Sequence, residues 1–284
     1  MTKIITRLLV FAIGLPGVLA LVFFFPLMNH LAANATAVLV SAIGAMEFSA
    51  MVSKRGFRLP TVEAAILGSL LPLAATLRVS FSVAGELELY VLTAAALWIV
   101  SSRVFSRSNE LASVSERILT AFSTLLYPGV LLIWIVRLNS FPHSTSLLLL
   151  MLLMVFGNDS VAWASGMLFG KGNRGIMPAS PNKSLAGFIG GISVSILCGV
   201  GAAFYLPEVF PSALGGPVAG AVLGLLTGFS TIIGDLAEST LKRSADVKDS
   251  GSIVPGRGGL LDSIDSLVFA APVYFAAYAL LFST

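Results

Sequence analysis

Apolar runs of about 20 residues repeat along this chain, and short polar stretches separate them. A helical run of this length matches the hydrocarbon thickness of a lipid bilayer. The composition agrees, because 56% of the 284 residues are hydrophobic and only 11% are charged, whereas soluble domains are about one quarter charged. The alternating pattern of membrane β-barrel strands is absent from the sequence. We therefore expect an all-α, polytopic integral membrane protein.

The apolar runs predict about nine transmembrane helices. Their expected ranges are residues 4–26, 31–52, 61–77, 87–101, 117–138, 146–169, 185–205, 214–241 and 260–282. The first run is too long for the apolar core of a cleaved signal peptide, so we keep it as a span. The single cysteine, Cys198, lies in an apolar run and excludes a disulfide within one chain. We expect it to be a small buried residue.

The Lys and Arg residues fall on one side of the predicted topology. If the nine helices alternate, 15 of the 17 lie on one side, and only Arg78 and Arg137 lie on the other. The positive-inside rule makes the rich side cytoplasmic, with the N-terminus inside. The two most polar loops, 171–184 and 242–259, also fall on that side. We expect a multi-pass protein of the inner (plasma) membrane whose site faces the cytoplasm, and the basic residues give no indication of nucleic-acid binding.

Charge is concentrated near the C-terminal end. Six of the fourteen acidic residues lie in one stretch: Asp235, Glu238, Asp246, Asp249, Asp262 and Asp265. The same stretch holds Lys242, Arg243, Lys248 and Arg257. On a helix, the spacing of Asp235, Glu238, Ser239 and Lys242 makes one face, and Asp262 and Asp265 share another.

Two carboxylate faces beside a glycine-rich loop suit a hard cation such as Mg²⁺, which leaves room for substrate phosphates. The Lys and Arg residues can then neutralise phosphate oxygens. The alternative is a solvated loop with ion pairs, which would account for Asp246 and Glu238. It does not explain Asp262 and Asp265 at the start of an apolar helix.

A second group of polar residues lies earlier in the chain. Asp159 is in the middle of an apolar helix, where an ionisable group usually faces a cavity or a partner; a helix-packing hydrogen bond is the alternative. Lys183 and Ser184 precede the next helix, whose N-terminus could bind phosphate, and the glycines that follow favour close helix packing. Glu47 and Glu63 lie near predicted cytoplasmic ends, where snorkelling or helix capping is at least as good an interpretation as function.

These motifs resemble the signature of the CDP-diacylglycerol synthases, or phosphatidate cytidylyltransferases, which is in outline S-x-x-K-R-x-x-x-x-K-D, then P-G-H-G-G, then D-R-x-D. The matching residues are Ser239, Lys242, Arg243, Lys248, Asp249, Pro255, Gly256, Gly258, Gly259, Asp262 and Asp265. The resemblance is dense over residues 158–266, so we divide the chain into N-terminal transmembrane helices of low similarity, 1–140, and a catalytic transmembrane region, 141–284. The chain departs from the signature at Arg257, Ser263 and the Leu185-Ala186 pair, which concerns substrate details more than the reaction type.

The resemblance implies that CTP and phosphatidic acid give CDP-diacylglycerol and pyrophosphate, by in-line attack of the lipid phosphate on the α-phosphorus. It also implies Mg²⁺, with or without K⁺. The implied metal ligands are Asp235, Asp262 and Asp265. The residues implied for holding or orienting the triphosphate are Lys242, Arg243, Lys248 and Asp249. The residues implied for substrate binding are Lys183, Ser184, Ser239, Arg257 and Asp159.

Two other functions stay open at this point. The lipid acceptor could be an ether-lipid phosphate instead of phosphatidic acid, or the reaction could be phosphorylation of a polyprenol by CTP. The intramembrane carboxylates could instead bind coupling ions in a transporter, although transporters usually contain repeated halves and no duplication is visible. A homodimer is compatible with the sequence, and nothing in the sequence requires one.

Overall fold

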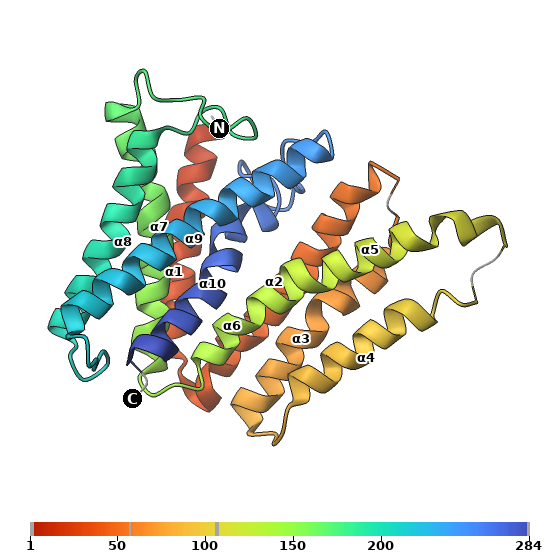
Figure 1. Cartoon of the computed structure of the whole chain (residues 1–284), viewed down its shortest axis with the longest axis horizontal. Helices are drawn as coiled ribbons and strands as arrows, with labels where there is room; N and C mark the ends of the chain where they lie inside the picture. Colours follow the sequence, from red (N-terminus) through yellow and green to blue (C-terminus); the bar gives the residue numbers. More distant parts are fainter. Residues whose placement is uncertain (1–2, 57, 106–107, 283–284) are drawn as a thin grey trace. The chain divides into compact units, whose positions relative to one another are not determined.

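The computed structural model describes residues 3–56, 58–105 and 108–282, and its regular structure there is helical (Figure 1). The elements are α1 (Lys3–Phe24), α2 (Leu27–Ser53), α3 (Thr61–Phe81), α4 (Leu87–Ser101), the 3₁₀ helix η1 (Ser108–Ser113), α5 (Val114–Thr124), the π-helix η2 (Leu125–Val130), α6 (Leu131–Leu138), α7 (Ser144–Phe169), α8 (Leu185–Tyr205), α9 (Gly216–Ser244) and α10 (Leu261–Phe282). Within these residues only two isolated β-bridges occur. The predicted all-α class is confirmed.

Seven helices in the described part of the chain are long and apolar enough to cross a membrane: Leu27–Ser53, Thr61–Phe81, Leu111–Leu138, Ser144–Phe169, Leu185–Tyr205, Gly216–Ser244 and Leu261–Phe282. Two shorter apolar helices, Ala12–Phe24 and Leu87–Ser101, correspond to the first and fourth predicted spans. The protein is therefore a multi-pass membrane protein. The count of nine and the orientation stay predictions.

Most helix boundaries lie within a few residues of the predicted ones. The assigned range of α2 begins at Leu27, but Met28, Asn29 and His30 adopt left-handed backbone angles. Because these angles are not those of a right-handed helix, the regular part of α2 begins after His30. This agrees with the predicted start at residue 31.

The chain divides into two compact units, each of which draws on more than one stretch of sequence. Unit 1 comprises Met1–Ser140 and Ser244–Ser263, and unit 2 comprises Phe141–Arg243 and Ile264–Thr284. The signature motifs are thus divided between the two units. The loop after α9 belongs to unit 1, while α9 up to Arg243 and most of α10 belong to unit 2. The predicted assignment of roles to residues 1–140 and 141–284 stays a prediction.

In unit 1, the buried core centres on α3 and also takes residues from α2, α4, α5, η2 and α6. The Ser41 hydroxyl of α2 lies 2.7 Å from the carbonyl oxygen of Gly68 and 2.9 Å from that of Pro128. Pro128 lies within η2 and has no N–H, so the helical hydrogen-bond pattern cannot be regular there. A Cβ at Gly68 would lie 2.8 Å from the Ser41 carbonyl oxygen. The glycine thus permits the close approach that lets one hydroxyl serve two other helices.

Arg78 and Arg137, the two exceptions to the charge bias, share one carboxylate in unit 1. Nη1 of Arg78 donates to both Glu88 oxygens at 3.1 and 3.2 Å, and Nε of Arg137 lies 3.7 Å from Glu88 Oε1. The Arg137 guanidinium also lies 5.0 Å from the ring centre of Trp134, a cation–π distance. Glu88 is buried, and the two arginines offset the negative charge of its carboxylate there.

In unit 2, small residues bring α7, α8 and α9 together. The buried Asn158 of α7 donates from Nδ2 to Ser195 Oγ on α8 and to the Gly228 carbonyl oxygen on α9, both at 3.2 Å. A Cβ at Gly191 would lie 3.0 Å from Asn158 Cγ, and one at Gly224 would lie 2.6 Å from a backbone atom of α8. The predicted close packing of the glycines at the start of α8 is confirmed, and it places one face of α7 against α9.

Candidate functional site

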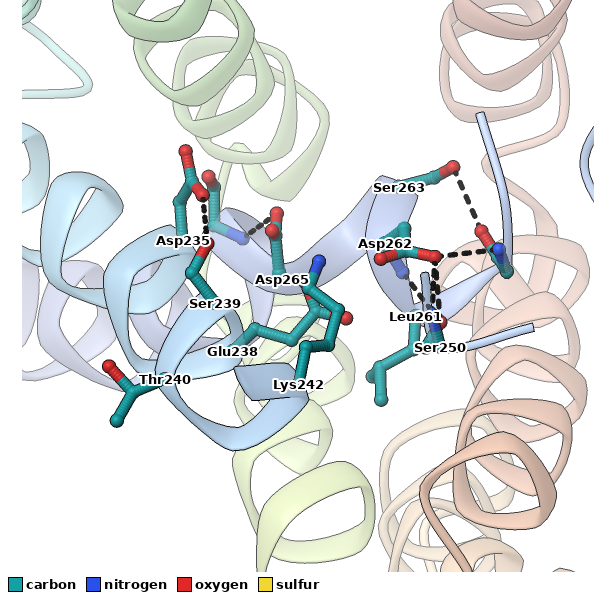
Figure 2. A network of polar contacts seen from close by, with 12 residues as sticks. Asp235, Glu238, Ser239, Thr240, Lys242, Ser250, Leu261, Asp262, Ser263 and Asp265 are labelled. Atoms are coloured by element: carbon teal, nitrogen blue, oxygen red, sulfur yellow. Dashed lines mark hydrogen bonds and ion pairs between the residues drawn. The ribbon is translucent and has the colours of Figure 1, made fainter. Parts of the chain in front are cut away.

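One face of α9 carries four polar side chains in unit 2, as their spacing predicts (Figure 2). Ser239 Oγ donates to Asp235 Oδ1 at 3.4 Å, and Lys242 Nζ donates to Glu238 Oε2 at 2.7 Å. Glu238 is 0% exposed and Lys242 is 9% exposed. The solvated-loop interpretation is therefore wrong for Glu238, because its carboxylate and the lysine form a buried ion pair.

Two further carboxylates of unit 2, from α7 and α10, join this face. Asp265 Oδ1 accepts a hydrogen bond from Ser266 N at 2.6 Å. Ser266 Oγ donates to Asp159 Oδ1 at 3.5 Å, so the helix-packing interpretation of Asp159 is confirmed. Asp159 also interacts electrostatically with both Asp235 and Asp265. Asp159 thus packs against α10 and belongs to the carboxylate cluster at the same time.

The carboxyl groups of Glu238 and Asp265 lie within hydrogen-bonding reach of each other. Two carboxylates cannot donate to one another, and Glu238 Oε1 is buried with no hydrogen-bond donor. Lys242 interacts electrostatically with both groups. A pair of this kind needs a proton or a nearby cation to be stable, and Lys242 supplies one positive charge.

The predicted phosphate-binding residues before α8 have different surroundings. Lys183 Nζ forms an ion pair with Asp235 Oδ2 and interacts with Asp159, so it belongs to the cluster. Ser184 is buried and is the N-cap of α8, where its side chain accepts a hydrogen bond from Gly187 N at 3.1 Å. An N-cap of this type stabilises a helix by about 1 kcal/mol. A phosphate contact by Ser184 stays a prediction.

The cluster of unit 2 consists of four carboxylates and two ammonium groups, which carry a formal charge of −2. Its members are Asp159, Asp235, Glu238, Asp265, Lys183 and Lys242. In the described residues no three His, Cys, Asp or Glu side chains are arranged as a ready set of metal ligands. The donors are nevertheless the carboxylate oxygens that Mg²⁺ prefers. The residues present fit Mg²⁺ in donor type, and its binding stays a prediction.

In unit 1, Asp262 closes the loop that precedes α10 (Figure 2). Its Oδ2 accepts hydrogen bonds from Ser250 N at 2.8 Å, Ser250 Oγ at 2.9 Å and Gly259 N at 2.7 Å. Three donors on one carboxylate oxygen hold the two ends of the loop together. The structure thus gives Asp262 a loop-closing role, and its predicted role as a metal ligand stays a prediction.

A further carboxylate of unit 1, Glu47 of α2, reaches the same loop. Its oxygens accept hydrogen bonds from Leu260 N at 2.9 Å and Leu261 N at 2.8 Å, and Ser250 Oγ lies 3.3 Å from Oε2. Glu47 is therefore a helix cap, as one interpretation of the sequence allowed, but it caps α10 rather than its own helix. The only sign of this role in the sequence was an acidic residue inside an apolar run. Its hydrogen-bond partners lie over 200 residues later in the chain, so they could not be predicted from spacing.

The remaining predicted residues lie at the surface or close to it. Lys248 and Asp249 are exposed, and Arg257 is half-buried in the turn where its N–H donates to the Val254 carbonyl oxygen at 3.1 Å. Arg243, in unit 2, is exposed, and its Nε lies 3.4 Å from the Ala179 carbonyl oxygen. Asp246 is exposed and pairs with Arg55 at 2.7 Å. The solvated interpretation is confirmed for Asp246, while the phosphate-binding roles of the others stay predictions.

Comparisons with known proteins agree with these motifs. A family model described as the cytidylyltransferase family matches residues 5–281. The chain is 37% identical over 143 residues to a phosphatidate cytidylyltransferase of Synechocystis, 38% over 169 residues to one of Haemophilus influenzae, and 39% over 131 residues to one of Bacillus subtilis. The alignments cover 50%, 57% and 45% of this chain, and 46%, 57% and 45% of those relatives. The chain spans about half the length of the curated relatives it matches.

Proposed function

Because the chain belongs to the cytidylyltransferase family, we propose that it transfers the cytidylyl group of CTP to phosphatidate. The products are CDP-diacylglycerol and pyrophosphate. The observation that carries this proposal is the partly buried cluster of carboxylates and lysines in unit 2, which suits polyphosphate chemistry at a membrane. The printed names of the relatives supply the acceptor, phosphatidate.

The proposed reaction is an in-line displacement at phosphorus. An oxygen of the lipid phosphate forms a bond to the α-phosphorus of CTP, and the bond from that phosphorus to the bridging oxygen of pyrophosphate breaks. Both reactants are anions, so the protein must mainly hold them together and offset their charge. The lipid phosphate is already ionised, and no strong general base is required.

In this proposal the residues of unit 2 divide the task by charge. Asp235 and Asp265 would hold Mg²⁺, with Asp159 beside them, and the ion would offset the charge that develops on the departing pyrophosphate. Lys183 and Lys242 would bind phosphate oxygens. Both lysines already lie against carboxylates of the cluster, so they can face phosphate groups while staying next to the proposed ligands.

The proposed place of action is the cytoplasmic face of the inner membrane. The acyl chains of phosphatidate can stay in the bilayer there, while CTP arrives from water. All six residues of the cluster belong to unit 2 of one chain, so the proposal requires no second copy of the protein.

The test uses the full-length protein purified in detergent, with phosphatidate, Mg²⁺ and one of CTP, dCTP or ATP. Pyrophosphate release and formation of the nucleotide-linked lipid are measured together. We expect stoichiometric release of both products with CTP, and a loss of at least about a hundredfold in Asp265→Asn, which corresponds to about 3 kcal/mol of lost charge stabilisation.

The matched control is Asp246→Asn, which removes an exposed carboxylate of the same sequence stretch and should retain activity. Pyrophosphate release only with an ether-lipid phosphate would make that lipid the acceptor in place of phosphatidate. Formation of CDP and a polyprenyl phosphate from CTP and a polyprenol would show phosphoryl transfer instead of cytidylyl transfer. A folded protein that releases neither pyrophosphate nor CDP with any acceptor would refute the enzyme proposal and favour ion binding for transport.

A further inference from the structure

The loop that carries the remaining signature residues is built around a side chain from the other end of the sequence. Glu47 lies on α2, whereas Lys248, Asp249 and Arg257 lie on the loop before α10, all within unit 1. We propose that Glu47 is a positioning residue, which holds this loop in the conformation that binds the phosphates of CTP. This inference rests on the proposed function for the identity of the ligand.

The first support is the set of hydrogen bonds at the start of α10. The first N–H groups of a helix have no partner within the helix, and the N-terminus carries partial positive charge. Glu47 receives the Leu260 and Leu261 N–H groups on separate oxygens, at 2.9 and 2.8 Å. Glu47 is only 6% exposed, so little water is available to replace it. The negative charge of Glu47 and both of its carboxylate oxygens therefore stabilise the N-terminus of α10.

The second support is the shape of the loop. A Cβ at Gly251 would lie 2.8 Å from Glu47 Cδ, and a Cβ at Gly259 would lie at the same distance from that atom. Real Cβ atoms essentially never approach another heavy atom so closely. The loop therefore wraps around the Glu47 carboxylate at two separate points, and a Cβ at either point would push the carboxylate out of its present position.

The third support is the link to Asp262 through Ser250. The Ser250 hydroxyl lies 2.9 Å from Asp262 Oδ2 and 3.3 Å from Glu47 Oε2. A hydroxyl has a single hydrogen, so the Ser250 hydroxyl can donate to only one of these two carboxylates at a time. The hydroxyl lies between Glu47 and Asp262, so displacement of Glu47 would change the surroundings of a group that helps to close the loop.

The test compares Glu47→Gln with the wild-type full-length protein. Glutamine keeps the size of the side chain but presents an NH₂ group to one of the two backbone N–H groups. We expect faster hydrogen exchange in peptides that cover residues 248–262, and a rise of about tenfold in the KM for CTP, since one charge-assisted hydrogen bond is lost. The KM for phosphatidate should stay within about twofold.

The matched control is Glu63→Gln, which alters a second carboxylate of unit 1, one that is partly buried and pairs with Arg103. Its hydrogen exchange over residues 248–262 should match the wild type. A second variant, Gly251→Ala, keeps the Glu47 charge but pushes against it from the loop, and it should reproduce the effect of Glu47→Gln. This variant keeps the proposal testable if Glu47→Gln does not fold.

Unchanged exchange over residues 248–262 in a folded Glu47→Gln protein would overturn the proposal. An unchanged KM for CTP together with faster exchange would overturn it as well, because the contact would then be structural only. If the wild-type protein shows no activity with CTP, the proposed function fails, whereas the exchange measurement still reports whether Glu47 holds the loop.

Discussion

Replacing Lys242 by methionine is expected to destabilise the folded chain far more than replacing its partner Glu238 by glutamine. The two side chains form a buried ion pair, and a simple pair would predict similar losses. The structure predicts an asymmetry because Asp265 lies against Glu238. Lys242→Met leaves two carboxylates together without the ammonium group, whereas Glu238→Gln leaves Lys242 beside Asp265.

The expected magnitudes follow from these contacts. Removing one partner of a buried ion pair costs about 3–5 kcal/mol, and we expect Lys242→Met to fall in this range. Glu238→Gln should cost about 1 kcal/mol, the value of one hydrogen bond, because the ammonium keeps a carboxylate neighbour and a repulsion disappears. The double variant Glu238→Gln/Lys242→Met should be more stable than Lys242→Met alone.

The measurement is unfolding of the purified protein in mixed detergent micelles with increasing SDS, followed by tryptophan fluorescence. Asp246→Asn is the control, because this exposed ion pair should contribute no more than about 1 kcal/mol. Equal losses for Lys242→Met and Glu238→Gln would refute the reasoning, since they would show that Asp265 does not share the ammonium group. A stable Lys242→Met protein would refute it more directly.

Four further substitutions test the packing within each of the two units by the same unfolding measurement. Gly224→Ala places a Cβ 2.6 Å from Ile196 Cα on α8 and should destabilise by about 1–3 kcal/mol or more, while Gly157→Ala, with no atom within 4 Å, should be neutral or stabilising. Ser41→Ala removes the hydroxyl shared by two carbonyl oxygens and should cost about 1 kcal/mol; a neutral result would mean that the carbonyls are satisfied without it. Glu88→Gln removes the carboxylate that faces two arginines and should cost about 1.5–3 kcal/mol, and a gain in stability would contradict the shared pairing.

The helices of this fold could be predicted from the sequence because each apolar run is a local property. The predicted range 185–205 coincides with α8, and the predicted start of the α2 span coincides with the end of the left-handed turn at His30. The π-helix η2 could not be predicted, although it contains Pro128, because a proline alone does not distinguish a kink from a helix end. The Ser41 contact that accompanies η2 joins segments 87 residues apart.

The candidate site was predictable where spacing along one helix decides the geometry. Asp235, Ser239 and Lys242 lie on one face of α9 as their spacing indicates. The burial of Glu238 was not predictable, because an i, i+4 pair with lysine has the same sequence pattern at a solvated surface and inside a protein. What packs against α9 decides between them, and Asp265 and Asp159 come from other helices. The contact of Glu47 with the loop before α10 depends on long-range packing in the same way.

The shared carboxylate at Glu88 also bears on how the chain enters the membrane. In the predicted orientation, Arg78 and Arg137 lie on the far side from the cytoplasm, and each cation carried across a potential of 100 mV corresponds to about 2.3 kcal/mol. Glu88 lowers the net charge of this group from two to one. The free-energy cost of moving this group across the membrane potential therefore corresponds to one positive charge instead of two. The hairpin formed by α3 and α4 supplies both Arg78 and Glu88, so the first arginine is neutralised within one hairpin and α6 adds the second arginine.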